Sequence, residues 1–244
     1  MKSEFNLKIN MSFLQIEKSE RRKNMNIELN KSNIKIEGNK LIVELTPELR
    51  SMLKIQQKPL KSLAPGTCII DNIGNKWLII RHDCDNTTKV WRKELLDDTY
   101  KFDDKSNNFA VSKIKDILNN ENGKILADIY KGFGKRNVLN DAVDLTSLDG
   151  LDTYGTYECK VHLGIIDDYR SARKMGLLRS ENKFPFWLDT PDSTNENASA
   201  SFVRIVNRGG WCDFDVCFWG GRGVRPFVSL DPEILVSVED EPEV

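Results

Sequence analysis

The fold of this chain is decided by residues 184–230, FPFWLDTPDSTNENASASFVRIVNRGGWCDFDVCFWGGRGVRPFVSL. This stretch holds three of the five tryptophans and two of the five cysteines of the chain. Apolar and polar residues alternate through residues 202–206, and the turn-forming residues Asn207, Gly209 and Gly210 follow directly. Alternation that ends in such a turn predicts a hairpin of antiparallel strands, so we expect a sheet in the C-terminal part of the chain.

Four residues of the same stretch are expected to be structural. Trp187 lies in an apolar run and is expected in the core, and Pro191 stops that run because proline cannot donate to a strand ladder. Pro226 marks the start or the edge of a closing strand for the same reason. Arg225 beside it is expected to bond buried carbonyl groups or a carboxylate such as that of Asp189, because guanidinium donors match such acceptors.

The N-terminal part is expected to form a small separate segment. Apolar and polar residues alternate on either side of Gly38-Asn39, which predicts a two-stranded hairpin, and residues 46–53 predict a short capped helix. We therefore divide the chain into three parts. Residues 1–60 form a polar arm with this hairpin and helix, residues 61–236 form the main domain, and residues 237–244 form an acidic tail that is expected to fray.

The main domain mixes strands and helices. Two apolar runs joined by a turn predict a hairpin near its start, and the residues there that are expected in the core are Cys68, Ile70, Trp77, Ile79 and Val90. Apolar spacing predicts two short helices in residues 111–130, broken at Asn122-Gly123. A strand over residues 160–166 and a helix from Asp167 or Asp168 follow. This order predicts an α+β fold of short antiparallel strands with a few helices.

The composition is typical of a soluble globular protein. Hydrophobic residues make up 39% of the chain and charged residues 30%, and the 36 basic and 37 acidic side chains leave a net charge of -1. Because the sequence has no long run of Lys or Arg, we do not expect specific nucleic-acid binding. No apolar run reaches the ~18 residues of a membrane span, and the first residues lack the apolar core of a secretion signal, so we expect a cytoplasmic protein.

Cysteine and histidine usage does not indicate a catalytic centre. The five cysteines are odd in number and scattered, and no export signal precedes them, so free and mostly buried thiols are expected. His82 and His162 each lie in or beside an apolar strand with no nucleophile motif around them. A site at His82 beside Asp83 and Cys84 is conceivable, but a hydrogen-bonded, partly buried side chain is expected there, and no catalytic residue is predicted.

Seven motifs carry a resemblance to a known family. They are LKSLAPGT, NKWLIIRHD, SKIKDILNNE, VDLTSLDGLDTYG, KVHLGIIDDYR, FWLDTPDS and GVRPFVSL, between about residue 60 and residue 235. In this order they resemble a family of unknown function found in prophages and in low-GC Gram-positive bacteria, related in fold to C-type lectins, phage tropism determinants and formylglycine-generating enzymes. The resemblance implies a C-type-lectin-like domain, phage or prophage origin, and a location in the cytoplasm or the phage particle.

The C-terminal strands and loops of such domains usually form the ligand surface, which points to the segment from Trp211 to Arg222. In an extended strand, one face carries Trp211, Asp213, Asp215 and Cys217, and the other carries Cys212, Phe214, Val216 and Phe218. The second face is apolar and is expected to pack on the core. The residues predicted to bind a ligand are therefore Trp211, Asp213, Asp215, Trp219 and Arg222.

These residue types favour a recognition role. Exposed Trp and Arg carry much of the binding energy at protein interfaces, and neighbouring carboxylates add selectivity. We therefore predict a non-enzymatic binding module for a protein or glycan partner. The competing interpretation is that the same tryptophan and aspartates cap the edge of a sheet.

Other roles remain open from the sequence. A phage structural or tail-associated component would use residues 1–60 as an oligomerisation or docking arm, and a homo-oligomer is compatible with it. A copper oxidase resembling formylglycine-generating enzymes would hold Cu(I) with Cys212 and Cys217, but their spacing on a regular strand puts the two sulfurs on opposite faces. Calcium would need the acidic loop from Asp141 to Asp152, which lacks the alternating aspartates of an EF-hand. Capping carboxylates and no cofactor are therefore expected.

Overall fold

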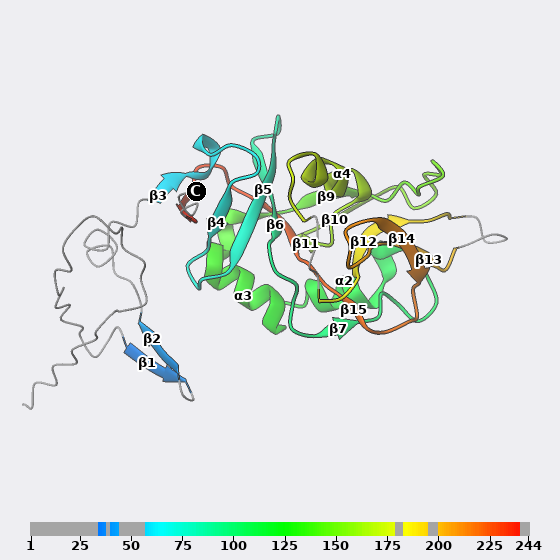
Figure 1. The fold of residues 1–244 in the computed structure, drawn as a ribbon, viewed down its shortest axis with the longest axis horizontal. Coiled ribbons are helices and arrows are strands. Elements are labelled where there is room, and N and C mark those ends of the chain that lie inside the picture. The colour runs from blue at the N-terminus through cyan, green and yellow to red at the C-terminus, as the bar shows by residue number, and fades with distance from the viewer. Residues whose placement is uncertain (1–33, 38–39, 44–56, 179–182, 195–199, 240–244) are drawn as a thin grey trace, which may run out of the picture. The chain divides into compact units, whose positions relative to one another are not determined.

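The computed structural model describes residues 34–37, 40–43, 57–178, 183–194 and 200–239 (Figure 1). The chain divides into two compact units, Met1–Gln56 and Gln57–Val244. In the first unit, β1 (Ile34–Glu37) and β2 (Lys40–Val43) pair as antiparallel strands, which confirms the predicted hairpin strands. The helix predicted over residues 46–53 lies outside the described residues.

The second unit is built mainly from antiparallel strands. Its larger sheet has the order β11 (Val161–His162), β16 (Phe227–Leu230), β6 (Thr87–Arg92), β5 (Lys76–Asp83), β4 (Cys68–Ile70), β17 (Leu235–Val238) and β3 (Gln57–Pro59), with β8 (Val138–Leu139) also on β16. A second sheet has the order β14 (Cys212–Val216), β13 (Phe202–Val206), β12 (Phe186–Pro191), β15 (Arg222–Gly223) and β7 (Thr99–Tyr100). β9 (Asp141–Asp144) pairs with β10 (Thr156–Cys159). Among these pairs, β12 with β15 is parallel.

The helices of this unit confirm the mixed α+β class. They are α2 (Lys113–Leu118), α3 (Lys124–Phe133) and α4 (Ile166–Lys174), with short 3-10 turns η2 (Leu60–Ser62), η3 (Phe109–Val111) and η4 (Lys135–Asn137). The break between α2 and α3 falls at Asn122-Gly123, as predicted. Among the described residues, no helix combines the length and the apolar character needed to cross a membrane.

Three local predictions need correction. The strand predicted over residues 160–166 is only β11, because Gly164 has a φ of 82° and the chain turns there into α4. α4 begins at Ile166, just before the predicted start, and the Asp168 carboxylate accepts a hydrogen bond from the Ile165 amide at 3.1 Å. Cys68 and Ile70 are half-buried rather than core residues, because Ile69 between them is the residue of β4 that enters the core.

The buried side chains form two clusters between the layers. Trp187 is 0% exposed in the first cluster, and its ring lies 5.7 Å from that of Phe102. Trp91 centres the second cluster, where its ring meets those of Phe186 and Phe227 edge-on. β12 contributes to both clusters because its alternate side chains point to opposite faces. The prediction that Trp187 is a core residue is confirmed.

Pro191, Pro226 and Arg225, which were predicted to be structural, lie at the ends of β12 and β16. Pro191 is the last residue of β12, at a shift in register against β13, and Pro226 directly precedes β16. The buried Arg225 guanidinium donates to the carbonyl oxygen of Arg92 at 2.9 Å and to that of Lys93. Of the two partners predicted for Arg225, buried carbonyl groups are therefore present.

The ends of the second unit extend beyond the predicted boundaries. β3 begins at Gln57, and β17 runs to Val238 while pairing with both β3 and β4. Glu239 extends the contact between β17 and β4, because its amide donates to the Cys68 carbonyl at 2.9 Å. Its carboxylate binds Lys93 at 2.7 Å and also binds Lys76. Residues 237–239 are thus part of the sheet and not of a frayed tail.

Candidate functional site

The β13–β14 hairpin holds the segment that the sequence selects as a ligand surface (Figure 1). Its turn is closed by hydrogen bonds from the Asn207 amide to the Trp211 carbonyl at 2.9 Å and from the Gly210 amide to the Asn207 carbonyl at 2.8 Å. The Trp211 ring lies directly on Gly209, since a Cβ atom there would stand 1.8 Å from a ring carbon. A glycine is therefore required under this ring.

Four large aromatic side chains are exposed within this short segment. The exposed fractions are 59% for Trp211, 49% for Phe214, 43% for Phe218 and 56% for Trp219. β14 lies between the two tryptophans and covers five residues, which at about 3.3 Å per residue extend over roughly 16 Å before the chain turns toward Trp219. The exposed rings form a row along the edge strand and not one compact pocket.

The structure reverses the predicted faces of β14. Asp215 and Cys217 are 7% and 0% exposed, whereas Phe214 and Phe218 of the supposed core face are exposed. The register explains the reversal: Asp215 lies opposite Val203, whose side chain is fully buried in the first core cluster. Because β14 is the edge strand, the core on its other face reaches Cys212 but does not cover Phe214.

The carboxylates of Asp213 and Asp215 accept hydrogen bonds from the backbone of β14 itself. The amides of Phe214 and Val216 point away from β13, and each donates to the carboxylate of the preceding residue at 2.9 Å. Arg222 donates through Nε to the Asp215 carboxylate at 2.5 Å, in an ion pair that is mostly buried. Asp213 and Asp215 therefore satisfy the outward amides at the free edge of the sheet, and Arg222 pairs with Asp215. Their role in binding a ligand stays a prediction.

Positive charge surrounds the Phe214 face of the hairpin. Arg204 lies opposite Phe214 in the register, and its guanidinium carbon is 5.9 Å from the centre of the Phe214 ring. Burial raises the pKa of the neighbouring Cys212 thiol, and the charges of Arg204, Arg170 and Arg173 oppose that rise. Sequence reasoning missed these arginines because α4 supplies two of them from outside the segment.

The residues considered for metal binding are separated or occupied. Cys217 belongs to the first core cluster, whereas Cys212 packs against the second, so the two thiols do not form a pair of ligands. The Asp141 carboxylate binds Lys89 and His162, and the Asp144 carboxylate accepts from the amide and hydroxyl of Thr146. Within the described ranges, no group of three or more metal-binding side chains is assembled.

A buried polar network joins the sheets, and no local sequence pattern indicates it. The His162 ring lies 2.6 Å from the Asp189 carboxylate and 3.1 Å from that of Asp141. Lys89 donates to Asp141 at 2.6 Å and to the Ser229 hydroxyl at 2.7 Å. All five side chains are buried, so the group resembles catalytic clusters in composition but is closed to a substrate.

The protonation of this network follows from its geometry. Burial alone would lower the pKa of His162, but hydrogen bonds and charge from Asp141 and Asp189 raise it above its usual value. Burial likewise opposes the charge on Asp141, yet His162 and Lys89 hold the pKa of Asp141 well below its usual range. Burial raises the pKa of Asp189, so the proton between His162 and Asp189 belongs to the pair. The network thus sets two basic side chains against two acidic ones inside the core.

His82 has a different environment. Its ring nitrogens lie 2.8 Å from the Thr88 hydroxyl and 2.8 Å from the Leu63 carbonyl, which confirms that it is hydrogen-bonded. The side chain is exposed rather than partly buried.

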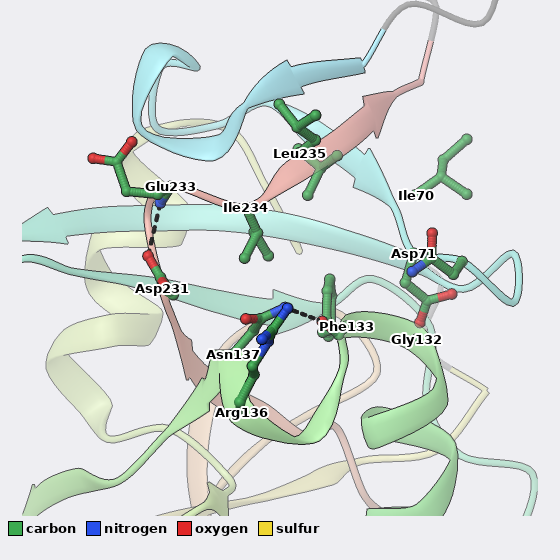
Figure 2. A pocket seen from close by; sticks show the side chains of 12 residues that line it. Ile70, Asp71, Gly132, Phe133, Arg136, Asn137, Asp231, Glu233, Ile234 and Leu235 are labelled. Atoms are coloured by element: carbon green, nitrogen blue, oxygen red, sulfur yellow. Dashed lines mark hydrogen bonds between the residues drawn. The ribbon is translucent and has the colours of Figure 1, made fainter. Parts of the chain in front are cut away.

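A cavity of about 560 Å³ lies at the far end of the unit, between α3, β4 and the start of β17 (Figure 2). Arg136 and Asn137 project into it, and Ile234 and Leu235 form an apolar wall. Asp71 in its lining accepts from the amides of Ile73 and Asn75 and from the Trp77 indole, so its carboxylate is satisfied by the fold.

No family model, curated protein or solved structure matches the chain. The functional argument therefore rests on the geometry described above.

Proposed function

We propose that this protein is a non-enzymatic recognition module that binds a protein partner through the exposed aromatic row of β14 and the loop after it. The observation that carries the proposal is the exposure of Trp211, Phe214, Phe218 and Trp219 within nine consecutive residues. Large aromatic rings are costly to leave in water and are the side chains that most often anchor protein interfaces.

The length of the row favours a protein over a glycan. Anchors spread along β14, over roughly 16 Å, suit a protein interface of standard size, which involves tens of residues on each side. A sugar ring needs a concave site with converging polar groups. The cavity identified in the described part of the chain lies near α3 instead.

The motif resemblance supports two further parts of the proposal. A C-type-lectin-like arrangement would place the ligand surface on these C-terminal strands, and the α+β class with mainly antiparallel strands is compatible with it. An origin in a phage or prophage would make a bacterial or phage protein the natural partner.

The test is binding to defined libraries. We would probe a random dodecapeptide display library and a glycan array with the wild type and with the Trp211→Ala, Trp219→Ala double variant. The wild type is expected to enrich peptides, and the double variant is expected to lose at least tenfold in affinity for them, about 1.4 kcal/mol or more.

A matched control removes exposed apolar side chains elsewhere. Ile73 and Leu235 are 46% and 58% exposed, so the Ile73→Ala, Leu235→Ala variant removes exposed apolar surface from the β4–β5 turn and β17 instead of β14. It should bind like the wild type, and all variants should melt within a few degrees of one another because exposed substitutions change stability little. Enrichment of the same peptides by the tryptophan double variant would refute the proposal.

A further inference from the structure

The cavity between α3, β4 and the start of β17 has walls that hydrogen bonds of the main chain hold in place (Figure 2). The Asn72 amide donates to the Gly132 carbonyl at 3.1 Å, which ties the turn after β4 to α3. The Asp231 amide donates to the Asn137 carbonyl at 2.9 Å, which ties η4 to the chain before β17. A Cβ atom on Gly132 would stand 2.5 Å from an Asp71 carboxylate oxygen, so glycine is required where α3 meets this turn. The cavity is therefore preorganised by the fold.

Arg136 is the charged side chain of the lining that is available to a ligand. The Asp71 carboxylate accepts four hydrogen bonds from neighbouring groups of the fold. The Asp231 carboxylate accepts from the Glu233 amide at 2.9 Å, and the Glu233 carboxylate binds Lys61 at 2.6 Å. Among the described side chains, none forms a hydrogen bond or ion pair with the Arg136 guanidinium, which is exposed and projects into the cavity.

Apolar side chains border the same cavity. Ile234 packs partly buried against the first core cluster, and Leu235 beside it is 58% exposed. The Phe133 ring, which also lines the cavity, is held edge-on against the Trp77 ring at a centroid distance of 5.1 Å. A ligand with an aliphatic or aromatic body would remove this apolar surface from water, which favours binding.

We infer that this cavity binds a small organic monocarboxylate with an apolar body. The carboxylate would meet the Arg136 guanidinium, whose planar set of donors matches a carboxylate. The apolar body would lie against Ile234 and Leu235. The cavity volume of about 560 Å³ falls within the range of small-molecule sites, which is about 300–1,000 Å³.

The charges of the lining restrict the ligand to a single negative charge. Asp71, Asp231 and Glu233 line the same cavity as Arg136 and would repel a multiply charged anion such as a nucleotide or a free phosphate. The inference is independent of the proposed function, because the lining residues come from α3, η4, β4 and the β17 region and not from β14.

The test is an NMR titration of the full chain labelled at the isoleucine δ1 methyl groups. The probes are hexanoate and phenylacetate, each compared with its neutral amide, hexanamide or phenylacetamide. Both carboxylates should shift the methyl signals of Ile234 and Ile70 and leave those of Ile166 and Ile205 unchanged, since the last two lie outside the lining. A dissociation constant on the order of 1 mM is expected for ligands of this size, with at least fivefold weaker binding of the amides.

A matched pair of variants tests the role of the charge. Arg136→Gln should bind the carboxylates at least fivefold more weakly and no better than the amides. Lys124→Gln removes an exposed charge from the start of α3 and should keep wild-type affinity. Both variants should melt within a few degrees of the wild type, because both positions are exposed.

The preference of the wild type for carboxylate over amide needs no variant and keeps the test decisive. Equal binding of the carboxylates and their amides would overturn the inference. Signals that stay unshifted at about 20 mM of either carboxylate, or that shift at Ile166 and Ile205 in place of Ile234, would also overturn it. Tighter binding of inorganic phosphate than of the carboxylates would do the same, because it would identify a phosphate site.

Discussion

His162 is the residue at which burial and charge oppose each other most directly. Its ring is 3% exposed, and it bridges Asp189 of β12 to Asp141 of β9. One proton is held across the 2.6 Å contact with Asp189, where burial raises the pKa of the carboxyl group. Removing the imidazole would leave two carboxylates in the core with too few donors, and such losses typically cost about 3–5 kcal/mol.

The network predicts a specific dependence of stability on pH. The folded-state pKa of His162 is raised above its ordinary value of 6.5, so its contribution is fully present below pH 6.5 and is lost as the pH rises through the folded pKa. Guanidinium unfolding of the wild type between pH 5.5 and 9 should show a fall of up to about 1.4 kcal/mol per pH unit relative to His162→Gln. His82→Gln is the control and should track the wild type, because His82 is exposed. An unchanged slope in His162→Gln would contradict the prediction.

At the scale of the element, β14 shows why sequence alternation indicates a strand more reliably than it indicates which face is buried. Both hairpin strands were predicted, because the alternation and the turn residues are local signals. The faces were wrong because Asp215 enters the protein with Arg222, and that pairing depends on where the chain returns after the turn. The buried partners of His162 come from strands far apart in sequence, so no local pattern reveals them either.

The edge-closing carboxylates of β14 yield a prediction about self-association. Asp213→Ala should free the outward amide of Phe214 beside an exposed aromatic side chain and create an edge that pairs with another copy. Sedimentation velocity from 5 to 200 µM should show more dimer for this variant than for the wild type, with a change in unfolding free energy of about 1 kcal/mol or less. Asp116→Ala removes an exposed carboxylate from α2 as a control. Equal association of all three proteins would count against an edge-closing role.

Across the whole molecule, β17 links strands from distant parts of the chain. It joins β3, the first strand of the unit, to β4, so residues 57–59 and 235–238 lie in one sheet. The sequence signal for this closure is weak, because residues 235–239 are short and partly acidic and resemble a solvated tail. Pairing with β3 and with β4, two strands that are distant in sequence, makes residues 235–238 a strand.

Truncation tests that closure. A chain ending at Val236 loses the last β17 pairs and the Glu239 ion pairs, and its unfolding free energy should fall by about 2–4 kcal/mol, whereas a chain ending at Glu239 should match the wild type. Contacts with Cys68, Lys76 and Lys93 hold the pKa of Glu239 at about 2, below its ordinary 4.5. The Glu239 contribution is therefore present above pH 4.5 and is lost as the pH falls toward 2, so Glu239→Gln should be less stable than the wild type at pH 7 and approach it near pH 2. Equal melting temperatures for the two truncations would show that β17 does not close the sheet.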